Sequence, residues 1–197
     1  MYNIVKRNIS FFSRKRYYYN SSYYYRRILS KYDNLDTYLG LFENSFNRKK
    51  AISNIKNQYS SDVEFGVSMK KAIGNSKPNH IIKNSVGFSV LLYRVKIGGY
   101  KAYLEMHFYR DKLFLFNYSF NCLTKGDKET ILDTLEKKYL LDQRDVDFRT
   151  QSIVDQFGSY ILVEDGVDFV IHYISQKEGA YDGILKLKQE EKENLFY

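Results

Sequence analysis

Hydrophobic side chains recur at alternating spacings of three and four residues in the first third of the chain. These positions are Tyr25, Ile28, Tyr32, Leu35, Leu39, Phe42 and Phe46. Such a stripe is typical of one face of an α-helix. Asp33-Asn34 and Gly40 interrupt it, so the pattern predicts two helices or one with a break, continued weakly by Ile52 and Ile55. We expect the stripe to pack on the rest of the protein. A coiled-coil seam is the alternative, although the breaks are badly placed for one.

A second, shorter helix is predicted after residue 60. Ser61 is followed three residues later by Glu64, which fits a capping box opening a helix over residues 65–73. Gly74 can take the left-handed position at the helix end, and Pro78 prevents continuation. We therefore expect a helix that leads into the sheet.

Strict alternation of apolar and polar residues marks the centre of the chain. A β-rich run over residues 88–97 is followed by Gly98-Gly99, which is typical of a two-residue hairpin turn. One face of the next strand would carry Tyr100, Ala102, Leu104, Met106 and Phe108, and the other Lys101, Tyr103, Glu105, His107 and Tyr109. A second turn at Arg110-Asp111 leads to a strand over residues 113–120. The pattern predicts a three-stranded antiparallel meander with one buried face.

The remainder of the chain repeats this order of helix and then strands. Thr124 and Asp127 resemble a capping box for a helix ending near Tyr139. The pattern then predicts a strand over residues 150–155 and a hairpin of residues 160–164 and 167–174. Residues 183–197 have charged and apolar residues in the proportion of a helix, and they could equally be a frayed end. The expected fold class is α+β: N-terminal helices, then an antiparallel β-meander and hairpin with packed helices. The expected division is a basic, Tyr-rich helical arm (1–60), an α+β body (61–178) and a charged tail (179–197).

The helix-then-meander unit over residues 62–120 carries a resemblance. The run from Phe65 to Ile73, the Gly-x-x-x-Pro from Gly74 to Pro78 and the meander from Leu91 resemble the units of β-lactamase-inhibitor-like and small outer-membrane lipoprotein folds. The chain departs from that pattern in lacking Trp, the tight Gly-x-Pro turn and a lipoprotein signal. The resemblance implies a scaffold that binds other proteins, not an enzyme.

Charge divides the chain unevenly. The first 32 residues contain eight Lys or Arg and no Asp or Glu, and eight of the 20 tyrosines. Removing these eight from the 31 basic residues leaves 23 against 23 acidic ones, so the remainder is neutral. The candidate residues for binding nucleic acid or another partner are Arg14, Lys15, Arg16, Tyr17, Tyr18, Arg26 and Arg27. Their cations can neutralise phosphates and their rings can stack on unpaired bases. A solvated basic helix whose tyrosines cover the core, an acidic protein groove and an anionic lipid surface are the alternatives.

Candidate catalytic and metal-binding groups are few. Glu105 and His107 share a strand face about 7 Å apart, and a metal would need a third ligand. Asp168 and His172 share another face, but about 13 Å of strand separates them. We interpret all four as polar residues on the solvent face of half-buried strands, and Cys122 as a small residue at the edge of the core. No catalytic residue, metal site or cofactor is assigned.

The sequence therefore favours a non-enzymatic protein that binds macromolecules or has a structural role, acting through its sheet surface and basic arm. The expected partner is a protein or a macromolecular assembly. A nucleic-acid-associated protein, such as a component of a large ribonucleoprotein assembly, is the first alternative, and an enzyme with an unrecognised site is the second. We expect no transmembrane segment, since no apolar stretch approaches about 20 residues. The expected location is cytoplasmic, with a mitochondrial presequence over residues 1–32 as the alternative.

Overall fold

A computed structural model describes residues 21–74, 76–84, 87–141 and 146–194. The chain divides into two compact units, Met1–Asn34 and Leu35–Tyr197. The first unit contains one described helix, α2 (Ser21–Asp33). The predicted break at Asp33-Asn34 is thus confirmed, because a new helix begins at Leu35.

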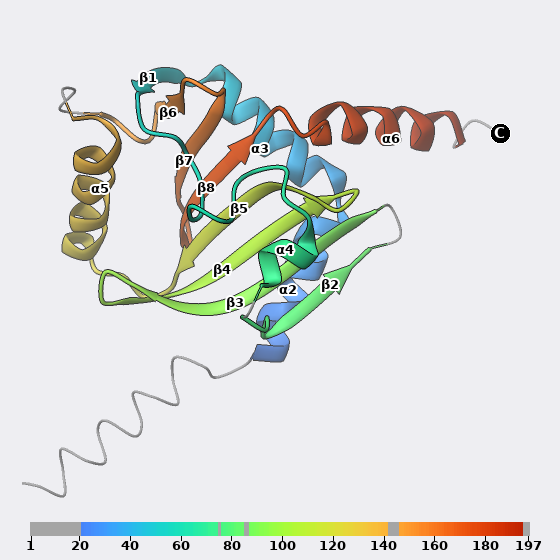
Figure 1. The fold of residues 1–197 in the computed structure, drawn as a ribbon, viewed down its shortest axis with the longest axis horizontal. Coiled ribbons are helices and arrows are strands. Elements are labelled where there is room, and N and C mark those ends of the chain that lie inside the picture. Colours follow the sequence, from blue (N-terminus) through green and yellow to red (C-terminus); the bar gives the residue numbers. More distant parts are fainter. Residues whose placement is uncertain (1–20, 75, 85–86, 142–145, 195–197) are drawn as a thin grey trace, which may run out of the picture. The chain divides into compact units, whose positions relative to one another are not determined.

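The second unit is built around one eight-stranded sheet (Figure 1). Its helices are α3 (Leu35–Asn47), α4 (Met69–Ile73), α5 (Lys125–Tyr139) and α6 (Ala180–Asn194). Its strands are β1 (Lys49–Ser53), β2 (His80–Lys83), β3 (Phe88–Ile97), β4 (Tyr100–Tyr109), β5 (Lys112–Phe120), β6 (Gln151–Asp155), β7 (Ser159–Asp165) and β8 (Phe169–Ser175). The strand order is β1-β6-β7-β8-β5-β4-β3-β2, and all pairs are antiparallel except β1 with β6. The expected α+β class is confirmed.

The predicted meander is present as β3, β4 and β5. Gly98 and Gly99 have φ angles of 56° and 90°, and Arg110 and Asp111 have 47° and 64°. Two consecutive residues with positive φ make the tight turn whose twist matches the flanking strands. The register is fixed by these turns and shifts once, at a bulge in β5 where Phe114 is the extra residue opposite His107 and Phe108 of β4.

Two local predictions in the first half of the second unit are wrong. Ile52 does not continue a helix but lies in β1, which pairs in parallel with β6 through Ala51 and Ile153. The helix expected over residues 65–73 begins only at Met69, because the Ser68 side chain, not that of Ser61, accepts the bond from the Lys71 amide. The boundary expected near residue 60 falls inside the second unit, which also includes α3 and β1.

Both faces of the sheet are covered. On one face, which we call the α5 face, α4 and α5 pack on a cluster that includes Leu91, Met106 and Phe116. On the other, the α3 face, Phe42 of α3 contacts Phe114 of β5 and Tyr181 of α6. Figure 1 shows α5 and α6 at opposite ends of the sheet. Residues that alternate along a strand are therefore buried in both directions.

This arrangement corrects the expectation of a single buried face. In β4 every residue of the run Leu104–Tyr109 is buried, including Glu105 at 2% exposure and His107 at 0%. Glu105 and His107 are thus not solvent-facing. His172 is likewise 0% exposed, whereas Cys122, expected at the edge of the core, is exposed.

Candidate functional site

The basic residues singled out from the sequence are described only in part. Arg14, Lys15, Arg16, Tyr17 and Tyr18 lie outside the described residues. Arg26 and Arg27 lie on consecutive positions of α2.

Helix α2 presents cations beside aromatic rings. The Arg27 guanidinium lies 5.7 Å from the centroid of the Tyr24 ring, and the Lys31 ammonium 5.0 Å from that of Tyr32. These distances are within the range of cation–π attraction. Arg26 is exposed, and Tyr23 is 65% exposed. The first turn of α2 carries no acidic residue, so positive charge dominates its surface until Asp33.

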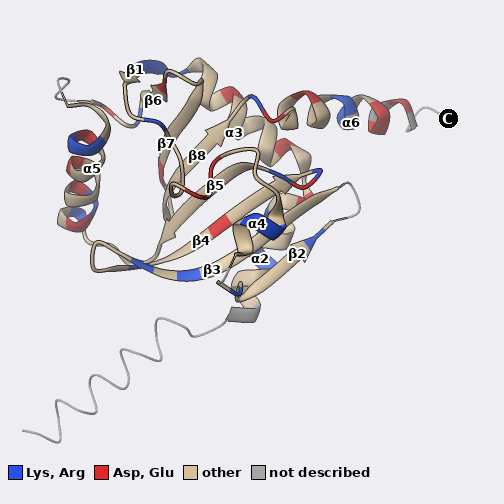
Figure 2. Cartoon of the chain, in the orientation of Figure 1, with Lys and Arg blue, Asp and Glu red and all other residues tan. Residues whose placement is uncertain are grey.

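The charges of the second unit are balanced and interspersed. Met1–Asn34 holds eight basic residues and Asp33, so the totals of 31 and 23 leave 23 basic and 22 acidic residues for Leu35–Tyr197. Figure 2 shows both signs of charge along α5 and α6. The Lys137 ammonium lies 2.5 Å from Asp133 Oδ2, and Lys125 lies 3.8 Å from Glu129. Exposed pairs of this kind contribute little to stability and create no strong local field.

A buried hydrogen-bond network crosses the α3 face. The Tyr38 hydroxyl lies 3.1 Å from His107 Nδ1, and His107 Nε2 lies 3.3 Å from Glu105 Oε2. The Asn117 amide donates to the same carboxylate oxygen at 2.9 Å. A carboxylate only accepts, so in the neutral imidazole Nε2 carries the proton and Nδ1 accepts from Tyr38. Burial, and secondarily the Glu105 charge, raise the pKa of Tyr38 well above its ordinary value, which keeps the hydroxyl protonated as a donor.

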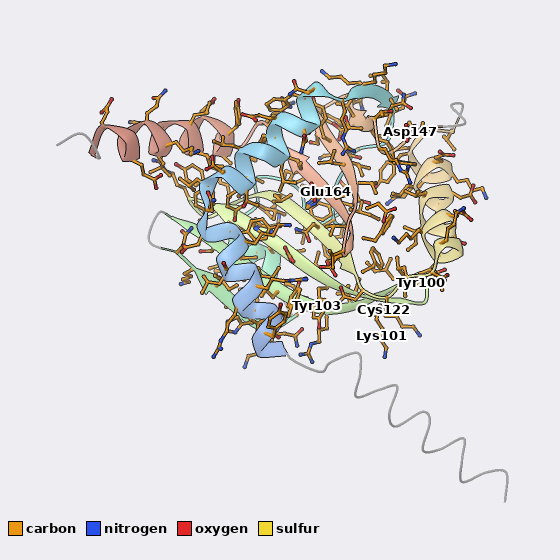
Figure 3. All side chains as sticks on the ribbon, turned by 180° about the vertical axis from the view of Figure 1, so that it is seen from behind. Tyr100, Lys101, Tyr103, Cys122, Asp147 and Glu164 are labelled. Atoms are coloured by element: carbon orange, nitrogen blue, oxygen red, sulfur yellow. The ribbon has the colours of Figure 1, made fainter. Side chains whose placement is uncertain are left out.

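His172 has a carboxylate partner that the sequence interpretation missed. Its Nε2 lies 3.1 Å from Glu164 Oε2, across the β7–β8 pair. The sequence pattern suggested only Asp168 as a neighbour of His172, and the expected distance between them along the strand was too long for a hydrogen bond. A partner on a neighbouring strand could have been found only from the register of β7 and β8. Figure 3 labels Glu164.

A cavity of about 290 Å³ lies between α5 and the sheet. Its lining draws on the segment before α4, the β3–β4 turn, the strands β5 and β8, and α5. The lining residues are Gln58, Tyr59, Ile97, Gly98, Tyr100, Phe116, Tyr118, Phe120, Thr130, Ile131, Thr134, Leu135, Lys138, Tyr139, Ile171 and Tyr173. Five of the sixteen are tyrosines. We call this site the tyrosine cavity.

Helix α5 is capped at its start and is hydrogen-bonded to other segments near both of its ends. At its start, the Thr124 hydroxyl accepts from the Asp127 amide at 3.2 Å, and Asp127 Oδ2 accepts from the Thr124 amide at 2.9 Å. The predicted capping box is thereby confirmed. The Thr124 hydroxyl, which also donates to Asp127 Oδ2 at 2.7 Å, and the Thr124 amide lower the pKa of Asp127, and a hydrogen bond from the Tyr100 side chain contributes. Figure 3 labels Tyr100 near the first turn of α5. At its end, the Tyr139 carbonyl accepts from Ser53 Oγ at 2.7 Å.

The floor of the tyrosine cavity is a set of stacked rings. Phe116 and Tyr173 stack with centroids 4.5 Å apart and planes inclined by 9°. Tyr118 meets both rings edge-on at 6.1 Å and 6.0 Å. Tyr59 also meets Phe116 edge-on, at 5.9 Å. Such contacts orient the rings and hold their hydroxyls in place.

Burial keeps the cavity hydroxyls protonated. It raises the pKa of Tyr173 and of Tyr118, and the neighbouring Tyr139 acts on both in the same direction. The groups are therefore neutral phenols that can donate or accept hydrogen bonds, not phenolate nucleophiles.

Metal binding finds no support in the described part of the chain. Within it, no group of three or more His, Cys, Asp or Glu residues could hold a metal ion. Among the described helices, none is both long and apolar enough to cross a membrane.

Comparison with known proteins identifies no relative: no family model, no curated protein and no solved structure matches the chain.

Proposed function

We propose that the protein is a non-enzymatic binding protein that attaches to a macromolecular assembly through its basic N-terminal segment, residues 1–34. Nucleic acid is the partner whose chemistry this segment fits best. The observation that carries the proposal is the separation of charge: eight basic residues and one acidic residue in the first unit, against near balance in the second.

The local chemistry of α2 supports nucleic acid. Phosphate contacts supply affinity without sequence preference, and each exposed aromatic ring can stack on an unpaired base for about 1–3 kcal/mol. Arg26 and Tyr23 are exposed on α2, so a cation and a ring are both accessible there. An acidic protein surface would use the cations but would offer no unpaired base for the exposed ring to stack on.

Salt dependence of RNA binding tests the proposal. Full-length protein is titrated against a fluorescent single-stranded oligonucleotide at several salt concentrations, and affinity is read from anisotropy. Binding should weaken steeply with salt, and replacing Arg26 and Arg27 by Gln should reduce the slope of log K against log salt by about 0.7 for each phosphate that the protein no longer neutralises. The matched control replaces Lys125 and Lys137, two exposed cations of α5, by Gln and should leave the slope unchanged.

Two results count against the proposal. If the Arg26 and Arg27 variant and its control give the same slope, α2 does not contact phosphate. If polyglutamate competes as well as RNA does, the segment binds an acidic protein surface, and the tyrosines have no part in partner choice.

A further inference from the structure

The tyrosine cavity is large enough for a ligand and is contained within the second unit. Its 290 Å³ corresponds to about ten water molecules at liquid density, and it lies just below the usual range of ligand pockets. All of its lining residues fall between Gln58 and Tyr173.

The cavity has an apolar floor and a polar rim. Phe116, Phe120 and Ile171 are each 3% exposed or less, and they form the floor with the ring of Tyr173. Thr130, Thr134 and Lys138 are exposed on α5 and form one side of the opening. Tyr59 is 38% exposed and also belongs to the opening. A ligand would insert a flat apolar part and leave a polar part near α5.

The tyrosine hydroxyls are close enough to influence one another. Tyr139 is hydrogen-bonded to Tyr173 and affects the pKa of Tyr118, which Tyr59 also affects. Tyr118, Tyr139 and Tyr173 all line the cavity, so three hydroxyl groups come together there.

The charge of the lining favours an anion. Lys138 is the one charged residue among the described lining residues, and its ammonium lies 4.6 Å from the centroid of the Tyr139 ring. The neighbouring Lys137 lies beside Asp133, whereas Lys138 is exposed and lines the cavity. Neutral phenol donors and one ammonium together provide hydrogen bonds for a carboxylate and a compensating charge.

From these observations we propose that the tyrosine cavity binds a small planar aromatic carboxylate, with its ring against Phe116 and Tyr173 and its carboxylate toward Lys138 and the tyrosine hydroxyls. Phe116 and Tyr173 turn their faces to each other, so a ligand ring would meet their edges. This selects for planarity, because a planar ring gains edge-on contacts that a puckered ring does not. The hydroxyls and Lys138 select for negative charge.

Three ligands separate these requirements. 2-Naphthoate supplies the ring and the carboxylate, 2-naphthylmethanol supplies the ring without charge, and a decalin carboxylate supplies the charge on a puckered ring. Each is titrated into the full-length protein and followed by NMR. We expect saturable binding of one 2-naphthoate per chain, with the other two ligands weaker by about fivefold or more, since each lacks one class of interaction.

Substitutions of three lining residues then test whether the ligand binds in the cavity. Thr134→Trp puts a large ring at the opening from an exposed helix position and should abolish binding. Tyr118→Phe removes one hydroxyl and keeps its ring packing, so affinity should fall about tenfold. Lys138→Gln should weaken 2-naphthoate about two- to fivefold and leave 2-naphthylmethanol unchanged.

Matched controls come from positions outside the lining. Lys137→Gln removes a cation from the adjacent position of α5, and Tyr181→Phe removes a half-buried hydroxyl from α6; neither should change affinity. Circular dichroism confirms that each variant is folded. The proposal is overturned if 2-naphthoate does not saturate, if Thr134→Trp leaves its affinity unchanged, or if 2-naphthylmethanol binds as tightly as 2-naphthoate.

Discussion

The hydrogen bond between Tyr38 and His107 offers a direct test of how α3 is held on the sheet. The two residues are 69 positions apart in the chain, and they are 1% and 0% exposed. The Tyr38 ring also stacks on Phe88 at 4.9 Å and lies 5.5 Å from Phe114. Tyr38→Phe keeps this ring packing and removes only the hydroxyl, so the experiment isolates the hydrogen bond.

The expected loss follows from what the substitution leaves behind. A neutral hydrogen bond contributes about 0.5–1.5 kcal/mol, and an acceptor left buried without a donor costs about 1–3 kcal/mol. The substitution leaves His107 Nδ1 without the Tyr38 donor, so we expect the higher range for the decrease in the free energy of unfolding. For a protein of this length, each kcal/mol lowers Tm by about 2–4 °C.

Urea denaturation measures the effect. The midpoint should shift at a constant m-value, because Phe exposes almost the same surface on unfolding. Tyr181→Phe, which removes a half-buried hydroxyl from α6, should change the free energy of unfolding by less than about 0.5 kcal/mol. A double-mutant cycle with His107→Leu should give a coupling of about 0.5–3 kcal/mol. A decrease below about 0.5 kcal/mol for Tyr38→Phe, or additive effects in the cycle, would refute the assignment of the bond.

Two further predictions concern α6 and the segment before it. Gly183→Ala should destabilise the protein by about 1–3 kcal/mol in thermal unfolding, because an added Cβ would overlap the Tyr109 ring. The control is Gly126→Ala in α5, where an added Cβ would meet no atom within 4 Å, and it should stabilise the protein by up to about 1 kcal/mol. Equal effects of the two substitutions would contradict the close approach of α6 to β4. Burial raises the pKa of Glu178 above its ordinary 4.5, against Lys112 and Lys177. The folded state therefore binds the Glu178 proton more tightly than the unfolded state, so stability falls as pH rises through and above 4.5. The Glu178→Gln variant should be more stable than the parent protein at about pH 7 and should not keep that advantage near about pH 4. A difference in stability that does not depend on pH would show that burial does not act on the carboxylate.

Local pattern was enough to predict the central sheet. The strands β3 to β5 follow from period-two alternation and from two turns that tolerate positive φ, and both signals lie within a few residues of each other in the chain. The capping box of α5 is equally local. In contrast, β1 is only five residues long and pairs with β6 about 100 positions later, so nothing in its own sequence distinguishes it from the end of a helix.

Burial of polar strand residues could not be predicted for a different reason. Glu105 and His107 alternate with apolar neighbours, which is the pattern of a strand with one face toward solvent. Their actual environment depends on Tyr38, which another element brings across the sheet. The tyrosine cavity likewise depends on residues distant in the sequence, since its lining comes from five separate segments of the chain. The sequence shows how many tyrosines there are but carries no signal for which of them converge.

The tyrosine cavity also bears on how the α5 face is packed. Protein interiors are close-packed, so a space of this size leaves its walls without the dispersion attraction they would otherwise gain. Helix α5 contributes a narrow buried stripe, Ile131, Leu135 and Tyr139, to a sheet face that is wider than the stripe. These stripe residues themselves line the cavity, together with the converging hydroxyls and Lys138. Incomplete packing alone would signify only reduced stability, but incomplete packing where neutral donors and a cation meet is what a ligand site requires.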